Sequence, residues 1–123
     1  MMIPLHIPAT KETPGVNFDA NNQIFEIKGI SLPKDANNFY QPIINWLKTY
    51  SSSPNLKTIF KIDLLYFNIT SSKQILNLFN MLKRVTSSNN ELTIEWHYDN
   101  DDEMLEMGQD YEYMVGVPFK FVS

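Results

Sequence analysis

The spacing of hydrophobic and polar positions predicts strands and helices that alternate along most of the chain. In the N-terminal third, two short stretches with β propensity, 16–18 and 23–28, flank Asn21 and Asn22. Asparagine tolerates the positive φ angles of a tight turn. We therefore expect a β-hairpin in this part of the chain.

A helix is predicted after the break at Leu32 and Pro33. Its apolar residues recur at steps of three and four and therefore share one helical face: Phe39, Ile43, Trp46, Leu47 and Tyr50. Pro42 lies early in this stretch, close to where a helix tolerates proline. Three serines at 51–53, followed by Pro54, are expected to end the helix.

Residues 58–67 give the strongest strand signal. They are β-branched, aromatic and nearly continuously apolar, which predicts a central strand covered on both faces. A second helix is predicted over 70–85, packed on the sheet through an apolar stripe of Ile75, Leu78, Phe79 and Leu82.

The last third of the chain adds two strands and a short helix. Leu92, Ile94, Trp96 and Tyr98 alternate with polar residues, which predicts a half-buried strand, and 103–111 and 117–122 indicate a helix and a final strand. The resulting order, ββ-α-β-α-β-α-β, indicates one α/β domain over residues 1–123 with a mixed β-sheet packed by helices. The first two long helices are expected to connect parallel strands.

Composition narrows the class of protein. The chain has 123 residues, 43% of them hydrophobic, enough for one domain with a continuous core. It has no cysteine, so disulfides, zinc-thiolate sites and thiol catalysis are excluded. The first residues lack the pattern of a signal peptide, and no stretch approaches the ~20 apolar residues of a membrane span. We expect a cytoplasmic protein that does not bind membranes.

The net charge of −4 comes largely from one segment, 99–112, which holds seven carboxylates and no Lys or Arg. This charge disfavours nucleic-acid binding. The segment is interpreted either as a solvated acidic face or as a docking surface for a basic partner, with Asp101, Asp102 and Glu103 as the candidate binding residues. A calcium-binding EF-hand loop starting at Asp99 requires Gly and Glu where the chain has Met104 and Asp110. No metal site is predicted.

No catalytic arrangement is recognisable. His6 and His97 have no partner at metal-ligand spacing, the four glycines are isolated, and no serine lies in a G-x-S-x-G motif. The paired carboxylates of the acidic segment lack apolar neighbours that would raise a pKa. We therefore expect a protein that is not an enzyme and has no cofactor.

Three consecutive hydroxyl residues, 70–72, join the central strand to the second helix. Ser71 and Gln74 match a capping box, with Ser71 as the N-cap, and such a cap contributes ~1 kcal/mol. The same position suits phosphorylation, because free N–H groups and the positive end of the helix dipole attract phosphate. From the pattern alone, capping is the simpler interpretation.

Five short motifs resemble the SiaC family of bacterial regulatory phosphoproteins. They are IPAT at 7–10, TPGV at 13–16, YFN at 66–68 before the hydroxyl cluster, WHYD at 96–99 and PF at 118–119, so the resemblance covers nearly the whole chain. It implies a fold similar to STAS-type anti-sigma-factor antagonists. It also implies a non-enzymatic switch, phosphorylated by a serine/threonine kinase and dephosphorylated by a PP2C-type phosphatase. The unphosphorylated form would bind and activate a diguanylate cyclase, in c-di-GMP signalling and biofilm control.

The chain departs from the family at one position. The resemblance places the family's phosphoacceptor threonine directly after Asn68, where this chain has Ile69. We therefore expect Thr70 to be the acceptor, with Ser71 as the fallback. The other candidate partner-binding residues of the loop are Asn68, Ser72 and Lys73. Two hypotheses remain. The first is a phosphorylation-switched binding protein. The second is a constitutive interaction module of the same fold, whose acidic segment docks a partner and whose hydroxyls only cap a helix.

Overall fold

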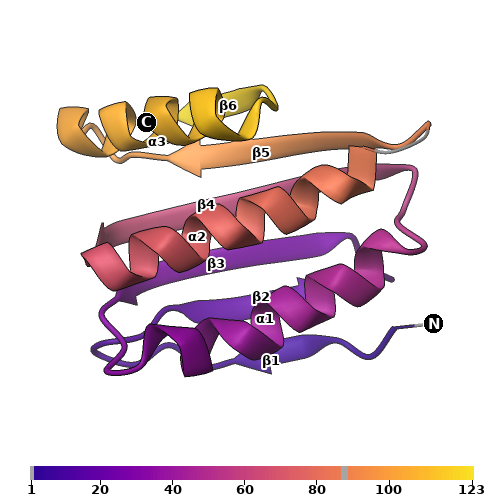
Figure 1. Cartoon of the computed structure of the whole chain (residues 1–123), viewed down its shortest axis with the longest axis horizontal. Helices are drawn as coiled ribbons and strands as arrows, with labels where there is room; N and C mark the ends of the chain where they lie inside the picture. Colours follow the sequence, from indigo (N-terminus) through magenta and orange to yellow (C-terminus); the bar gives the residue numbers. More distant parts are fainter. Residues whose placement is uncertain (1, 87–88) are drawn as a thin grey trace.

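Three helices cover one face of a six-stranded sheet in the computed structural model, which describes residues 2–86 and 89–123 (Figure 1). The strands are β1 (Leu5–Ile7), β2 (Gly15–Asp19), β3 (Ile24–Ser31), β4 (Lys57–Phe67), β5 (Glu91–His97) and β6 (Phe119–Val122). The helices are α1 (Ala36–Ser51), α2 (Ile69–Leu82), which continues into a 3₁₀ turn at Lys83–Thr86, and α3 (Asp102–Val115).

The strands follow one another across the sheet in the order β1-β2-β3-β4-β5-β6. The pairs β1–β2 and β2–β3 are antiparallel, whereas β3–β4, β4–β5 and β5–β6 are parallel. The predicted α/β fold, the mixed sheet and the inner position of β4 are therefore confirmed. The short strand β1 was not predicted, and α3 provides a third parallel crossover in addition to the two expected.

Strand β4 is covered on one face only, so the prediction of a strand buried on both faces was wrong. Thr58, Phe60, Ile62 and Leu64 are buried, while the residues between them point to the open face. On that side Ile59 is 36% exposed, and Leu65, further along, is 60% exposed. The reason is the placement of the helices, all of which lie on the same side of the sheet (Figure 1).

The core lies between the sheet and the helices. The predicted stripe of α2 is confirmed, because Ile75, Leu78, Phe79 and Leu82 are all fully buried. In α1, Ile43, Leu47 and Tyr50 are buried, whereas Phe39 and Trp46 are only half-buried. Pro42 lies in the second turn of α1, further from its start than predicted, and its side chain is exposed.

The predicted hairpin is confirmed as β2 and β3. Asp19 holds the turn, since its carboxylate accepts hydrogen bonds from the backbone N–H of Asn22 (3.3 Å) and from its side-chain amide (2.7 Å). The positive φ falls on Gln23, at 58°, and not on Asn21 or Asn22 as expected.

The parallel strands β3, β4 and β5 end at the same edge of the sheet, and α1, α2 and α3 all begin there (Figure 1). This edge therefore brings the two candidate regions, the hydroxyl cluster and the acidic segment, to one end of the molecule. The predicted short helix at 103–111 is longer in the structure and ends at Gly116, whose φ of 76° requires glycine-like freedom. Among the described residues, none of the helices combines the length and apolarity that a bilayer crossing requires.

Candidate functional site

Helix α2 begins one residue earlier than predicted, and its N-cap is Asn68. The Asn68 Oδ1 accepts a hydrogen bond from the backbone N–H of Ser71 at 2.9 Å. The assignment of Ser71 as the N-cap, with Gln74 completing a capping box, was therefore wrong. Ser71 is instead the third residue of the helix, and its side chain points into the core.

A chain of buried hydroxyls holds Ser71 in place. Ser71 Oγ donates to the Ser31 carbonyl (3.1 Å), and Ser31 Oγ donates to Ser71 Oγ (2.9 Å). Since each hydroxyl has one proton, Tyr40 must be the donor in its 2.6 Å contact with Ser31 Oγ. Burial raises the pKa of Tyr40 to about 12, so it keeps this proton. Ser71 is fully buried, so in this conformation the fallback acceptor offers no hydroxyl to a kinase.

Thr70 and Ser72 lie on either side of this buried serine. Thr70 is exposed, and its hydroxyl donates to Asn68 Oδ1 at 3.1 Å. Ser72 is half-buried, and its hydroxyl donates to the Ile69 carbonyl at 2.8 Å. Of the three hydroxyls, that of Thr70 is the most accessible, and it lies in the first turn, where helical N–H groups lack intrahelical partners. Lys73 is exposed one turn further along.

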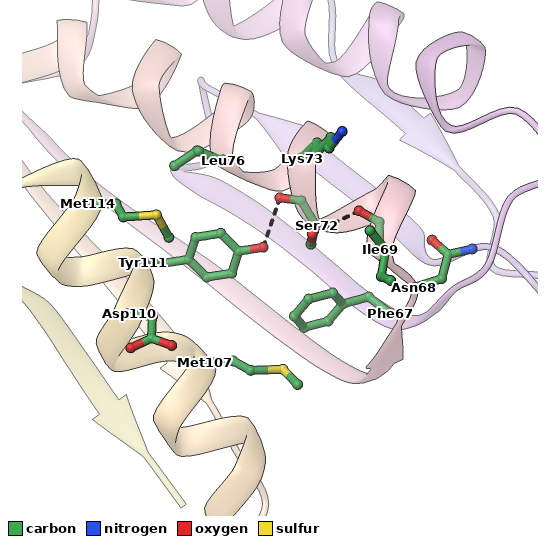
Figure 2. Close-up of a pocket in the computed structure, with 10 residues that line it drawn as sticks. All are labelled: Phe67, Asn68, Ile69, Ser72, Lys73, Leu76, Met107, Asp110, Tyr111 and Met114. Carbon is green, nitrogen blue, oxygen red and sulfur yellow. Dashed lines mark hydrogen bonds between the residues drawn. The ribbon is translucent and has the colours of Figure 1, made fainter.

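The first turns of α2 face α3 across a pocket of about 410 Å³, here called the α2–α3 groove (Figure 2). Ten residues line it: Phe67, Asn68, Ile69, Ser72, Lys73, Leu76, Met107, Asp110, Tyr111 and Met114. Tyr111 joins the two helices, because its hydroxyl donates to the Ser72 carbonyl at 2.9 Å. Burial raises the pKa of Tyr111 well above its usual range, so this hydroxyl remains a donor at neutral pH.

The surface at this groove is unusually apolar for an exposed region. Ile69 is 79% exposed, and Met107 and Met114 are 40% and 54% exposed. Leu65 and Tyr66, at the end of β4, are also more than half exposed but do not line the groove, and Leu65 belongs to the open face of the sheet. Clustered exposed apolar residues of this kind are typical of binding surfaces. Among the ten described residues that line the groove, Lys73 and Asp110 are the charged ones, one on each helix.

The predicted acidic residues contribute to the helix itself. Asp101 is the N-cap of α3, accepting hydrogen bonds from the backbone N–H groups of Glu103 (3.0 Å) and Met104 (3.3 Å). Asp102 and Glu103 are exposed in the first turn, where their charge complements the helix dipole. All three lie at the same edge of the sheet as Asn68, but none of them lines the α2–α3 groove.

The structure thus unites some of the candidate residues and separates others. Asn68, Ser72 and Lys73 line the groove, and their role in partner binding stays a prediction. Sequence reasoning missed the α3 side, formed by Met107, Asp110, Tyr111 and Met114. Their spacing of three, four and seven residues was the available signal, since it places them on one helical face.

The two histidines lie apart from this groove. His6 is exposed in β1, and His97 contacts Glu95 at 3.4 Å on the open face of the sheet. Within residues 2–86 and 89–123, no group of three or more His, Cys, Asp or Glu side chains is arranged to hold a metal ion.

Comparison with known proteins yields matches along almost the entire chain. The model of the SiaC family of regulatory phosphoproteins matches residues 7–123. An uncharacterized protein of Pseudomonas aeruginosa strain UCBPP-PA14 is 24% identical over 119 residues, covering 96% of this chain and 94% of the relative.

Two solved structures have the same fold. The crystal structure of apo-SiaC from P. aeruginosa matches with a TM-score of 0.89 and 23% identity, over 99% of this chain and all of that one. A chain in the crystal structure of the diguanylate cyclase SiaD in complex with its activator SiaC, also from P. aeruginosa, matches with a TM-score of 0.87 and 22% identity. That match covers 96% of this chain and 98% of the other.

Proposed function

The chain belongs to the SiaC family of regulatory phosphoproteins, and from this premise we propose that it binds and activates a diguanylate cyclase without catalysing a reaction itself. The observation that carries the proposal is the match to a family whose P. aeruginosa member is the activator of a diguanylate cyclase. Through such a partner the chain would control c-di-GMP synthesis and, with it, biofilm formation.

The α2–α3 groove and its surroundings are the proposed docking surface. Support comes from the exposed apolar side chains of Ile69, Met107 and Met114 around a partly apolar pocket. Burial of such side chains is the main source of affinity in protein interfaces. Asp102 and Glu103, at the same edge of the sheet, would attract a basic surface of the partner during encounter.

The proposal includes a phosphorylation switch at Thr70, set by a serine/threonine kinase and reset by a PP2C-type phosphatase. Thr70 is exposed, and its hydroxyl contacts only the nearby Asn68 side chain among the hydrogen bonds of the described residues. A phosphate there would lie at the positive end of α2 and three residues before Lys73, so the fold would tolerate it. A docked partner would instead have to desolvate a group carrying a charge of about −1.5 to −2.

A binding and activity assay tests the first part of the proposal. Purified diguanylate cyclases of the same organism, tested individually, are expected to include one that binds the chain and produces c-di-GMP faster in its presence. Ile69→Asp should weaken that binding, whereas Ile59→Asp, on the open face of the sheet, should not. Absence of binding and activation with every cyclase would contradict the proposal.

Site mapping tests the switch. After treatment with the cognate kinase, mass spectrometry should locate the phosphate on Thr70, and Thr70→Ala should abolish it. Thr70→Glu should weaken cyclase binding, while Thr49→Glu, at an exposed threonine of α1, controls for the added charge. Phosphate outside 70–72, or phosphate that leaves binding unchanged, would contradict the switch.

The second candidate function is a constitutive interaction module that binds its partner without phosphorylation. Ile69 supports it, because this residue stands at the position where the resemblance places the family threonine, and its side chain is 79% exposed. An apolar residue there would strengthen docking and remove the acceptor. The intact mass after co-expression with the kinase distinguishes the two candidates, since only the switch predicts an increase of one phosphate.

A further inference from the structure

Two methionines stand out at the α2–α3 groove because their side chains are exposed. Met107 and Met114 are 40% and 54% exposed, whereas Met104, in the same helix, is 5% exposed. They are seven residues apart and therefore lie on the same face of α3. Figure 2 shows their thioether side chains extending from α3 on either side of Tyr111.

We infer that Met107 and Met114 form an oxidation-sensitive site, and that converting their thioethers to sulfoxides releases the partner from the α2–α3 groove. The inference rests on the proposed function, because it needs a partner that docks there. Methionine suits a docking surface, since its flexible, polarisable side chain adapts to the opposing surface. The same exposure makes the sulfur accessible to oxidants in the free protein.

The oxidant is a peroxide, and the step balances without a further reactant. The thioether sulfur attacks one oxygen of hydrogen peroxide, the O–O bond breaks, and one oxygen is transferred to sulfur. The sulfur gives up two electrons, and the second oxygen of the peroxide leaves as water after proton transfer. Methionine sulfoxide reductases restore the thioether at the expense of a thiol reductant, with one enzyme for each sulfoxide epimer.

A sulfoxide in this groove would lack a hydrogen-bond donor on the α3 side. The Tyr111 hydroxyl already donates to the Ser72 carbonyl, and the Asp110 carboxylate only accepts. The donors that line the groove, the Lys73 ammonium and the Asn68 amide, belong to the α2 side, so burying a sulfoxide of α3 against a partner would cost it much of its hydration. We expect binding to become weaker by about ten-fold, a typical consequence of one such buried group.

The experiment compares dissociation constants for the purified diguanylate cyclase before and after treatment of the chain with hydrogen peroxide. Peptide mapping is expected to find Met107 and Met114 oxidised well before Met104, and prior binding of the cyclase should protect both. For the chain without substitutions, the dissociation constant after peroxide treatment should be about ten times that before treatment. This ratio should fall to about one for the double variant Met107→Leu with Met114→Leu, whatever the starting affinity of that variant.

Met81→Leu is the matched control, because Met81 is half-buried in α2 and does not line the groove. It should retain the ten-fold ratio, and treatment with both reductases should restore the original affinity. Two results would overturn the inference: equal reactivity of Met107, Met114 and Met104 toward peroxide, or a ratio of dissociation constants near one for the chain without substitutions. A reduced chain that binds no cyclase would instead contradict the proposed function, while the mapping would still show whether the two methionines react selectively.

Discussion

Replacing Gly108 with alanine is expected to lower the free energy of unfolding by about 2 kcal/mol, although alanine is the better helix former. Gly108 lies in the middle of α3, directly over the indole ring of Trp96. A Cβ atom added there would be 2.5 Å from Trp96 Cδ1, 2.6 Å from Nε1 and 2.7 Å from Cγ. Either the ring or the helix has to move.

Neither can move freely. The Trp96 side chain is 1% exposed, and its Nε1–H donates to the Met104 carbonyl at 2.9 Å, one turn before Gly108. Its ring also packs against Phe79 and Tyr111. Overpacking of this kind typically costs about 1–3 kcal/mol, and three contacts with a rigid ring place Gly108 at or above the top of that range. The intrinsic preference of a helix for alanine over glycine offsets about 1 kcal/mol.

Thermal unfolding measures the outcome, with an expected fall in melting temperature of roughly 6–10 °C. Gln109→Ala is the matched control, because Gln109 is the exposed neighbour in the same helix and should change stability by less than about 0.5 kcal/mol. In a double-mutant cycle, Gly108→Ala should cost less in a Trp96→Phe background, since the smaller ring leaves room for the methyl group. A higher melting temperature for Gly108→Ala would refute the reasoning.

Three further predictions concern the core, the buried tyrosines and the acidic residues. Phe79→Ala should lower the free energy of unfolding by ~3–5 kcal/mol, because the ring is fully buried, and a denaturation midpoint that barely moves would contradict this. The pKa of the Tyr40 hydroxyl is about 12 in the folded chain, against 10.0 for an unperturbed tyrosine, so Tyr40 loses its proton at a lower pH in the unfolded chain. The free energy of unfolding, measured with urea, should therefore fall as the pH rises from 10 to 12. Tyr40→Phe should make the free energy of unfolding depend less on pH in this range. Asp102→Asn with Glu103→Gln, which keeps the Asp101 cap, should slow association with the cyclase at low salt, and an unchanged on-rate would exclude steering by these residues.

Local pattern predicted the elements well and the environment of β4 poorly. The order of strands and helices follows from apolar spacing, which depends only on neighbouring residues. Coverage of β4 depends on where the crossover helices lie, which its own sequence does not specify. Lys61 and Asp63 were nevertheless the available signal, since both point to the open face and interrupt the apolar run at a period of two.

The start of α2 shows why the cap was misassigned. Asn68 and Ser71 are both good N-caps, and Ser71 with Gln74 matches a capping box. Asn68 is the N-cap because the Ser71 hydroxyl is buried in the core. There it bonds to Ser31, 40 residues earlier in the chain, which in turn contacts Tyr40. Such a contact has no local signature.

The α2–α3 groove was beyond sequence reasoning for a related reason. Its two sides are some 40 residues apart, joined by the hydrogen bond from Tyr111 to the Ser72 carbonyl. In the sequence, the hydroxyl residues 70–72 pointed to the α2 side of the groove. The acidic segment 99–112 was considered as a docking surface only because of its charge. In the structure, the part of α3 that reaches the groove is its apolar face, with Met107 and Met114.

The position of the cap also determines which hydroxyl is available for regulation. With Asn68 as the cap, the next residues occupy the first helical turn at intervals of about 100°, so their side chains point in different directions. Ser71 enters the core, Ile69 and Ser72 line the groove, and Thr70 faces solvent. Phosphate on Thr70 would leave the buried hydroxyl chain of Ser71 intact, so it should change docking and not stability. Thr70→Glu is therefore expected to weaken cyclase binding at an unchanged melting temperature. Phosphate mapped to Ser71 would require the first turn of α2 to open, and a loss of stability would then accompany the loss of binding.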